Sequence, residues 1–171
     1  TPEKIDDLEY PNLPVIQGEF LDSAEVEAAI AGQEAVLCTN GAGAGRTNQR
    51  EEATRNIVQE MDRKGDQRLI CHSSLGVGDR RAFLGAFTSH VIVCLFVRHS
   101  FADHERQEAV IEVPPMKWTI VSNPHVMVTR HHVFYRNVFT ANDRVIKGKI
   151  SRADVADFML KQLTDDSYLQ S

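Results

Sequence analysis

The chain has 171 residues, of which 42% are hydrophobic and 25% are charged, and its formal net charge at pH 7 is -5. These values fit one globular domain over residues 1–171, and the acidic balance argues against a nucleic-acid partner. The longest apolar run, residues 91–97, is far shorter than the roughly 18 residues of a membrane span, so we expect no membrane partner.

Apolar runs alternate with helix-capping patterns at the start of the chain. Residues 15–18 have the composition of a short strand. Asp22 and Glu25 have the spacing of a capping box, which predicts a helix that ends at Gly32. The next apolar run, residues 35–38, predicts a buried strand.

The same alternation continues to the end of the chain. Asn48 and Glu51 repeat the capping spacing before a long helix that Gly65 closes. The later expectations are a strand that begins at Leu69, mostly helix over 80–113, a strand over 117–121, a loop with short strands over 125–147, and an amphipathic helix capped by Ser151. Strands and helices that alternate with short connections predict an α/β fold with a parallel sheet and right-handed crossovers.

The stretch from Arg68 to Asp79 carries the strongest functional signal. It begins as a buried strand, ends in Ser73 and Ser74, and continues into a glycine-containing turn. Ligands bind at the carboxyl ends of strands in open α/β sheets, so these hydroxyls are candidates for a binding site. An ordinary Ser/Gly turn after a strand explains the same local sequence equally well.

The three cysteines, Cys38, Cys71 and Cys94, are widely spaced and each lies in an apolar run. This pattern indicates buried thiols in a reducing compartment, so we expect a cytoplasmic protein. The chain has neither a CxxC pair nor a close Cys/His cluster, and we expect no metal site.

Five stretches of the sequence, taken together and in this order, carry a resemblance to a known family: residues 18–22, 53–58, 73–79, 102–109 and 150–158. They resemble the atypical short-chain dehydrogenase/reductases, the NmrA-like NAD(P)-binding proteins, and are most similar to the biliverdin-IXβ reductase (flavin reductase) branch. The resemblance implies a Rossmann-like parallel sheet with helices on both faces and a cofactor that is NADP or NAD.

The chain departs from this family at its start. The family opens with a strand, a glycine-rich phosphate loop and a helix, and this sequence has no such opening. Compared with the family, the sequence lacks the first strand-helix-strand unit, roughly 30 or more residues. Two explanations stay open. Either the sequence is a fragment or a truncated gene product, which we favour, or the protein has abandoned ordinary cofactor binding and exposes unpaired strand edges.

The resemblance implies a set of cofactor-binding residues. Glu19 and Phe20 hold the place that meets the adenine, and residues 39–42 hold the loop over the nicotinamide ribose. The full expected set is Glu19, Phe20, Thr39, Asn40, Gly41, Ala42, Ser73, Ser74, Asn123, Pro124 and His125. A solvent-facing acid at Glu19 and a loop without ligand over 39–42 are the alternatives.

The resemblance also implies two catalytic residues, Ser74 and His104. A hydroxyl at Ser74 can hydrogen-bond a carboxamide or a substrate carbonyl. An imidazole that titrates near neutrality at His104 can relay a proton or hold a phosphate, although a surface histidine on a charged helix is equally compatible. The Tyr-x-x-x-Lys pair of ordinary short-chain dehydrogenases is absent from the sequence.

These features predict an NAD(P)H-dependent reductase that passes hydride to a flat conjugated acceptor, a flavin, a tetrapyrrole or a quinone-like molecule. We expect a monomer whose partner is a small-molecule substrate. The first alternative is a sensor or scaffold protein that binds NAD(P) without turnover, and the second is a degenerate fragment that binds nothing.

Overall fold

The structure is a computed structural model that describes residues 12–41, 48–65, 67–74, 98–123, 126–127 and 150–170. Its elements, in chain order, are α1 (Ser23–Ile30), β1 (Ala35–Cys38), α2 (Gln49–Lys64), β2 (Arg68–Ser74), α3 (Arg98–Glu112), β3 (Lys117–Asn123), β4 (Val126–Met127), β5 (Ile150–Ser151), α4 (Arg152–Lys161) and a 3-10 helix (Asp166–Tyr168). The helix expected over residues 80–113 is present from Arg98 onward, and its earlier part lies outside the described residues.

The three longer strands form one parallel sheet in the order β1-β2-β3. Cys38 of β1 faces Cys71 of β2, and Ser74 of β2 faces Asn123 of β3. All three strands therefore end at the same edge of the sheet. The short strands β4 and β5 form a separate parallel pair. This architecture confirms the predicted Rossmann-like α/β fold.

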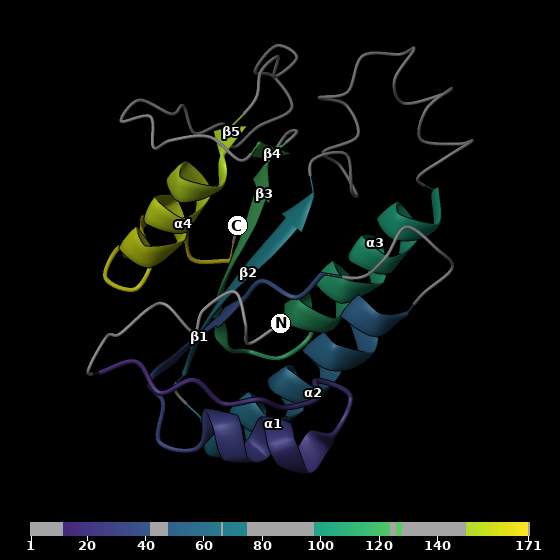
Figure 1. The fold of residues 1–171 in the computed structure, drawn as a ribbon, viewed down its shortest axis with the longest axis vertical. Helices are drawn as coiled ribbons and strands as arrows, with labels where there is room; N and C mark the ends of the chain where they lie inside the picture. The colour runs from purple at the N-terminus through teal and green to yellow at the C-terminus, as the bar shows by residue number, and fades with distance from the viewer. Residues whose placement is uncertain are drawn as a thin grey trace.

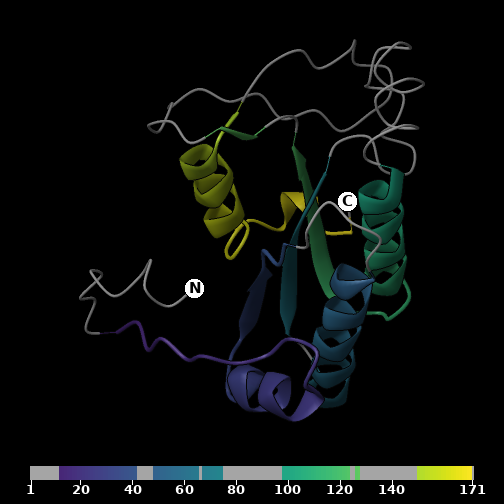
Figure 2. The same ribbon diagram turned by 45° about the vertical axis from the view of Figure 1, so that its right-hand side comes forward.

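Helices cover both faces of the sheet, with α2 and α3 on one face and α4 on the other (Figures 1 and 2). Strand alternation explains the two apolar layers, because successive side chains of β2 project to opposite faces. The larger layer holds Val26, Ile30, Cys38, Ile57, Val58, Met61, Leu69, Cys71, Ile111 and Ile120. The smaller layer, under α4, holds Ile70, Val121, Val155 and Met159.

The first helix begins as its sequence predicts. The Asp22 side chain accepts hydrogen bonds from the backbone N–H groups of Ala24 and Glu25. The carboxylate of Glu25 reaches further back than a standard capping box and accepts from the backbone N–H of Glu19 at 2.6 Å. Gly32 follows the helix with a φ of 75°, a conformation that favours glycine.

The start of α2 differs from the prediction. Asn48 precedes the helix but makes no side-chain capping bond. The cap comes instead from Asp103 of α3, whose carboxylate accepts from the backbone N–H groups of Arg50 and Glu51, each at 3.3 Å. Local spacing could not show this, because the capping residue lies about fifty positions further along the chain.

The strand expected over residues 15–18 does not form. Val15 and Ile16 are 51% and 73% exposed, and the segment carries no ladder pairing in the structure. A strand needs a neighbour for its backbone groups, and β-branched composition alone does not supply one. This prediction was wrong.

A buried arginine joins the sheet to the end of the described chain. Arg68, the first residue of β2, is 7% exposed and donates from Nη1 to Asp166 Oδ1 at 2.8 Å. Its Nη2 donates to the backbone carbonyl of Asp165 at 2.9 Å. We call this set of contacts the Arg68 clasp. It fixes the 3-10 helix against the amino end of the sheet.

Candidate functional site

The carboxyl edge of β1, β2 and β3 carries polar side chains on both faces of the sheet. On the face covered by α2 and α3, Ser73 is 1% exposed, and its hydroxyl donates to Glu108 Oε1 at 2.5 Å. The same hydroxyl oxygen lies 3.4 Å from His104 Nδ1. Ser73 and His104, both predicted from the sequence, are therefore brought together by β2 and α3.

The hydrogen bonds assign the tautomer of His104. Its Nδ1 lies 3.2 Å from Gln107 Oε1, which is only an acceptor, so Nδ1 carries the proton and donates. Because Ser73 gives its own proton to Glu108, its oxygen accepts from the same Nδ1. In the neutral ring the other nitrogen, Nε2, then keeps a lone pair and acts as an acceptor.

The electrostatic setting of His104 departs from the expected ring that titrates near neutrality. Burial lowers its pKa to about 4, and the nearby positive charge of Arg50 acts in the same direction. At pH 7 the ring is therefore neutral. It can accept a hydrogen bond, but it is poorly suited to hold a phosphate or to donate a proton.

Gln107 connects His104 to the end of β1. Its Nε2 donates to Asn40 Oδ1 at 3.1 Å and to Thr54 Oγ1 at 3.0 Å, and it lies 3.4 Å from Cys71 Sγ. Gln107 is fully buried, and the sequence analysis did not identify it. The only sequence signal was its position one helical turn after His104, which places both side chains on one face of the helix.

The other face of the same edge carries a second polar group. Ser74 follows Ser73 along β2, so its side chain projects to the opposite face, where it is half-buried. On that face His72 Nε2 contacts Asn123 Oδ1. Burial is the largest cause that lowers the pKa of His72. The two predicted catalytic residues, Ser74 and His104, thus lie on different faces of the sheet.

The remaining predicted residues are distributed around this edge and away from it. Thr39 and Gly41 are exposed and Asn40 is half-buried. Among the described residues, no atom lies within 4 Å of the position that a Cβ on Gly41 would take. Ala42, Pro124 and His125 lie outside the described residues.

Glu19 and Phe20 lie apart from this group. Both are exposed, and the Phe20 carbonyl accepts from Asn56 Nδ2 of α2 at 3.0 Å. The segment leading into α1 lies low in Figure 1, whereas the carboxyl ends of β2 and β3 point upward. The structure does not bring these two residues to the edge that holds Ser74 and Asn123.

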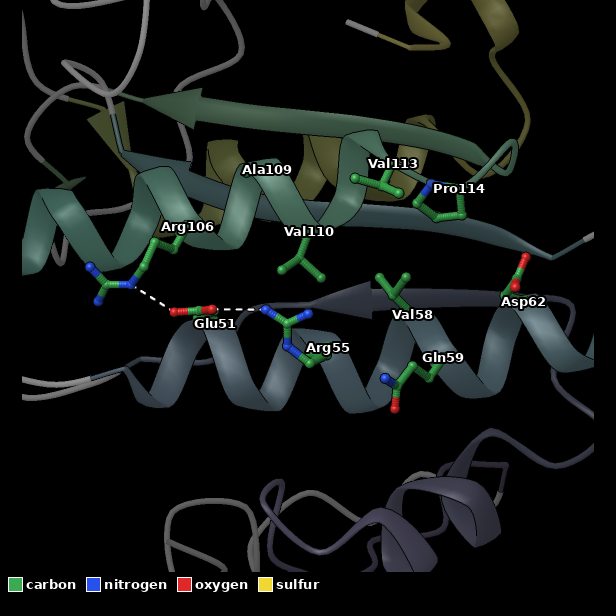
Figure 3. Close-up of a pocket in the computed structure, with 10 residues that line it drawn as sticks. All are labelled: Glu51, Arg55, Val58, Gln59, Asp62, Arg106, Ala109, Val110, Val113 and Pro114. Carbon is green, nitrogen blue, oxygen red and sulfur yellow. Dashed lines mark hydrogen bonds and ion pairs between the residues drawn. The ribbon is translucent and has the colours of Figure 1, made fainter.

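A cavity of about 430 Å³ lies between the outer sides of α2 and α3 (Figure 3). Its lining includes Val58 and Val110, and at one end Glu51 pairs with Arg55 at 2.8 Å and with Arg106 at 2.7 Å. The cavity shares no lining residue with the polar edge of the sheet. We therefore place the candidate site at the strand ends and not in this cavity.

The described part of the chain shows neither a metal-binding cluster nor a membrane-spanning helix. There, no three His, Cys, Asp or Glu side chains gather closely enough to hold a metal ion. Among the helices that the structure describes, none combines the length and apolarity needed to cross a membrane.

A parallel α/β sheet with polar groups gathered at the carboxyl ends of its strands defines a Rossmann-like nucleotide-binding domain. The sequence agrees with this class. Residues 1–166 match the NAD(P)H-binding family, and the chain belongs to that family.

Solved structures share the fold at low sequence identity. A short-chain dehydrogenase/reductase (wide type) from Veillonella parvula, in complex with NADP, aligns with a TM-score of 0.76 and 19% identity over 100% of this chain and 74% of that one. ChuY, an anaerobillin reductase from Escherichia coli, aligns with a TM-score of 0.68 and 21% identity over 86% of this chain and 66% of that one. A protein from Streptococcus pneumoniae, assigned as an NADH-flavin reductase, aligns with a TM-score of 0.60 and 13% identity over 96% of this chain and 80% of that one.

This chain thus spans about two thirds of the ChuY chain. Asn40, just after β1, and Ser74, at the end of β2, are half-buried and carry hydrogen-bonding side chains, the type of group that a nicotinamide carboxamide requires.

Proposed function

We propose that the domain belongs to an NAD(P)H-dependent reductase whose acceptor is flat and conjugated, such as a flavin, a tetrapyrrole or a quinone-like molecule. The observation that carries the proposal is the pair of polar groups on the two faces of one strand edge, Ser73 with His104 and Ser74 with His72 and Asn123. The reductases among the structural neighbours, ChuY and the assigned NADH-flavin reductase, support this choice of acceptor.

Each of these residues would have its own binding role. Asn40 and Gly41 would contact the nicotinamide ribose, and the Ser74 hydroxyl would donate to the carboxamide or to a carbonyl of the acceptor. Neutral His104 would accept a hydrogen bond at Nε2, while its Nδ1 would donate to the Ser73 hydroxyl oxygen and fix the position of that side chain. The cofactor, when bound, supplies the hydride, while the protein orients the reactants and excludes water.

Two serine variants test this assignment. We expect Ser74→Ala to lower the turnover of FMN or biliverdin by roughly 10–100-fold and to leave NADPH affinity little changed. Ser73→Ala should instead lower stability, because Glu108 would lose the donor that it accepts at 2.5 Å. Ser23→Ala, at an exposed position at the start of α1, is the matched control. Unchanged turnover in Ser74→Ala would remove that hydroxyl from the mechanism.

A sensor that binds NAD(P) without turnover is the second candidate. The low pKa of His104 favours it, because a ring that is neutral at pH 7 is a weak proton donor. A fluorescence titration with NADPH and NADH, followed by a turnover assay with flavin and tetrapyrrole acceptors, separates the two. Binding without turnover of any acceptor would establish the sensor and overturn the reductase.

The proposal extends to the state of the protein in the cell. We propose a cytoplasmic monomer that acts on a small molecule, without a nucleic-acid or membrane partner. The acidic net charge of -5 supports the first exclusion. Light scattering coupled to size-exclusion chromatography should give one 19.2 kDa species, and a mass twice that value would overturn the monomer.

A further inference from the structure

Cys38 and Cys71 face each other across two strands of the sheet. They are Cα partners in the parallel ladder of β1 and β2. Both are free thiols, and both side chains belong to the apolar layer under α2 and α3, so they project to the same face. Adjacent strands lie about 4.8 Å apart, and disulfides join Cα atoms roughly 4.4–6.8 Å apart. The register therefore places the two thiols side by side, and a disulfide requires their Cβ atoms to draw slightly closer, to about 3.5–4.5 Å.

The polar contacts of the two thiols are unequal. Cys38 Sγ donates to Asn40 Oδ1 at 3.3 Å, and Cys71 Sγ lies 3.4 Å from Gln107 Nε2. The hydrogen bond from Cys71 lowers the pKa of Cys38 to about 7, whereas the same bond and complete burial raise the pKa of Cys71. Cys38 is therefore the better nucleophile of the pair and reacts first, and Cys71 is the thiol that reacts second.

Cys38 lies at the end of its strand, next to exposed residues. It is the last residue of β1, and exposed Thr39 and Gly41 follow it closely. Because the Cys38 side chain is itself only 3% exposed, we expect a hydroperoxide to reach it more readily than a bulky disulfide such as oxidised glutathione.

We propose that Cys38 and Cys71 form a modification site at which a hydroperoxide is reduced and an intramolecular disulfide is made. The Cys38 sulfur attacks one peroxide oxygen, the O–O bond breaks, and Cys38 becomes a sulfenic acid while one water leaves. The Cys71 sulfur then attacks the Cys38 sulfur, the S–O bond breaks, and a second water leaves. The two thiols lose two electrons and two protons, which the hydrogen peroxide takes up.

The reaction would change the hydrogen bonds at the strand edge. The disulfide removes the thiol proton that Cys38 gives to Asn40 and draws the Cys71 sulfur toward β1, away from Gln107. This inference goes beyond the proposed function, because the disulfide forms or fails to form whether or not the domain turns over an acceptor.

The test uses the full chain, reduced and then treated with hydrogen peroxide. Remaining thiols are blocked with N-ethylmaleimide, and intact mass and peptide maps are recorded. We expect a loss of about 2 Da for the two hydrogens and a fall in labelled cysteines from all three to Cys94 alone. Cys94→Ser, which removes the third cysteine, should give the same loss and the same linked peptides.

The variants Cys38→Ser and Cys71→Ser should each lose the 2 Da change, about the mass of two hydrogens. Cys71→Ser should gain oxygen at Cys38 instead, whereas Cys38→Ser should keep Cys71 as an unmodified thiol, because that thiol is buried and its pKa is raised. A disulfide that contains Cys94, or a wild-type chain in which Cys38 gains oxygen without linking to Cys71, would overturn the proposal. If a variant fails to fold by circular dichroism, the linked peptide from the wild-type chain and from Cys94→Ser decides the question.

Discussion

The carboxylate of Asp103 holds Arg50 twice. Its Oδ2 lies 3.3 Å from the backbone nitrogen of Arg50 and 3.3 Å from the Nη1 atom of the same residue. Asp103 is fully buried, and the Arg50 side chain is 9% exposed. One carboxylate on α3 thus caps α2 and neutralises a buried guanidinium, which makes the two helices on this face of the sheet interdependent.

Asp103→Ala should therefore be costly. It removes the cap and leaves the Arg50 charge buried without this partner, so we expect the free energy of unfolding to fall by about 3 kcal/mol. Asp103→Asn should lose less, because its amide oxygen still accepts from a backbone N–H. Urea denaturation measures both. Asp62→Ala, at an exposed position of α2, is the control and should change stability by less than about 0.5 kcal/mol. Equal effects at Asp62 and Asp103 would refute the capping role.

Acid should destabilise the domain through His104. Its pKa in the folded chain is about 4, against an ordinary value of 6.5. The unfolded chain takes up a proton as the pH falls through 6.5, while the folded chain does so only near pH 4. Stability is thus present above pH 6.5 and is lost as the pH falls toward 4.

We expect His104→Gln to flatten this dependence. Between about pH 7 and pH 4.5 the wild type should lose about 2 kcal/mol more than the variant does. Denaturant midpoints measured across this range check the prediction, and the other titrating groups cancel because both proteins share them. Parallel stability curves for the two proteins would show that the ring titrates alike in the folded and unfolded chains.

Gln107→Leu should loosen the end of β1. It keeps a similar side-chain volume but removes the donor to Asn40 and Thr54, both of which accept from Gln107 Nε2. We expect a loss of about 2 kcal/mol and roughly tenfold faster amide exchange over residues 39–41. Hydrogen-exchange mass spectrometry measures this. Gln59→Leu, exposed on α2, should leave exchange over 39–41 unchanged, and no difference between the variants would contradict the bracing role of Gln107.

Arg68→Met should open the Arg68 clasp. Methionine keeps much of the aliphatic packing but cannot donate to Asp166 and the Asp165 carbonyl. Because the Asp166 side chain is 77% exposed and stays solvated, we expect a modest loss of about 1–2 kcal/mol. Chymotrypsin should cut faster at Tyr168 in the variant. Arg63→Met, whose side chain is 69% exposed, should be cut at the wild-type rate.

Local patterns in the sequence predicted α1 to α4 and β1 to β3, but they did not predict β5 or the 3-10 helix over Asp166–Tyr168. The apolar runs at residues 35–38 and from Leu69 are β1 and β2, and Asp22 caps α1 as its spacing predicts. These features depend on neighbours within a few positions. Residues 15–18 show the limit, because strand composition does not reveal whether a partner strand is present.

The candidate site depends on register and on contacts between distant residues. The sequence marks Ser73, Ser74 and His104, but only the structure shows that Ser73 and not Ser74 lies on the face of β2 toward His104. A one-residue difference along a strand exchanges the two faces. The sequence did not identify Gln107 and Glu108, because position along a helix does not reveal partners on other elements of the fold.

The Arg68 clasp also sets an order of events during synthesis. The partners of the Arg68 guanidinium are made 97 and 98 residues after it. While the chain is still growing on the ribosome, the guanidinium of Arg68 therefore has to stay hydrated. Arg68 cannot be buried at the end of β2 until residues 165–166 have emerged. The amino end of the sheet is thus completed only after those residues are made, and a nascent chain stopped before them would present this end of the sheet to chaperones and proteases.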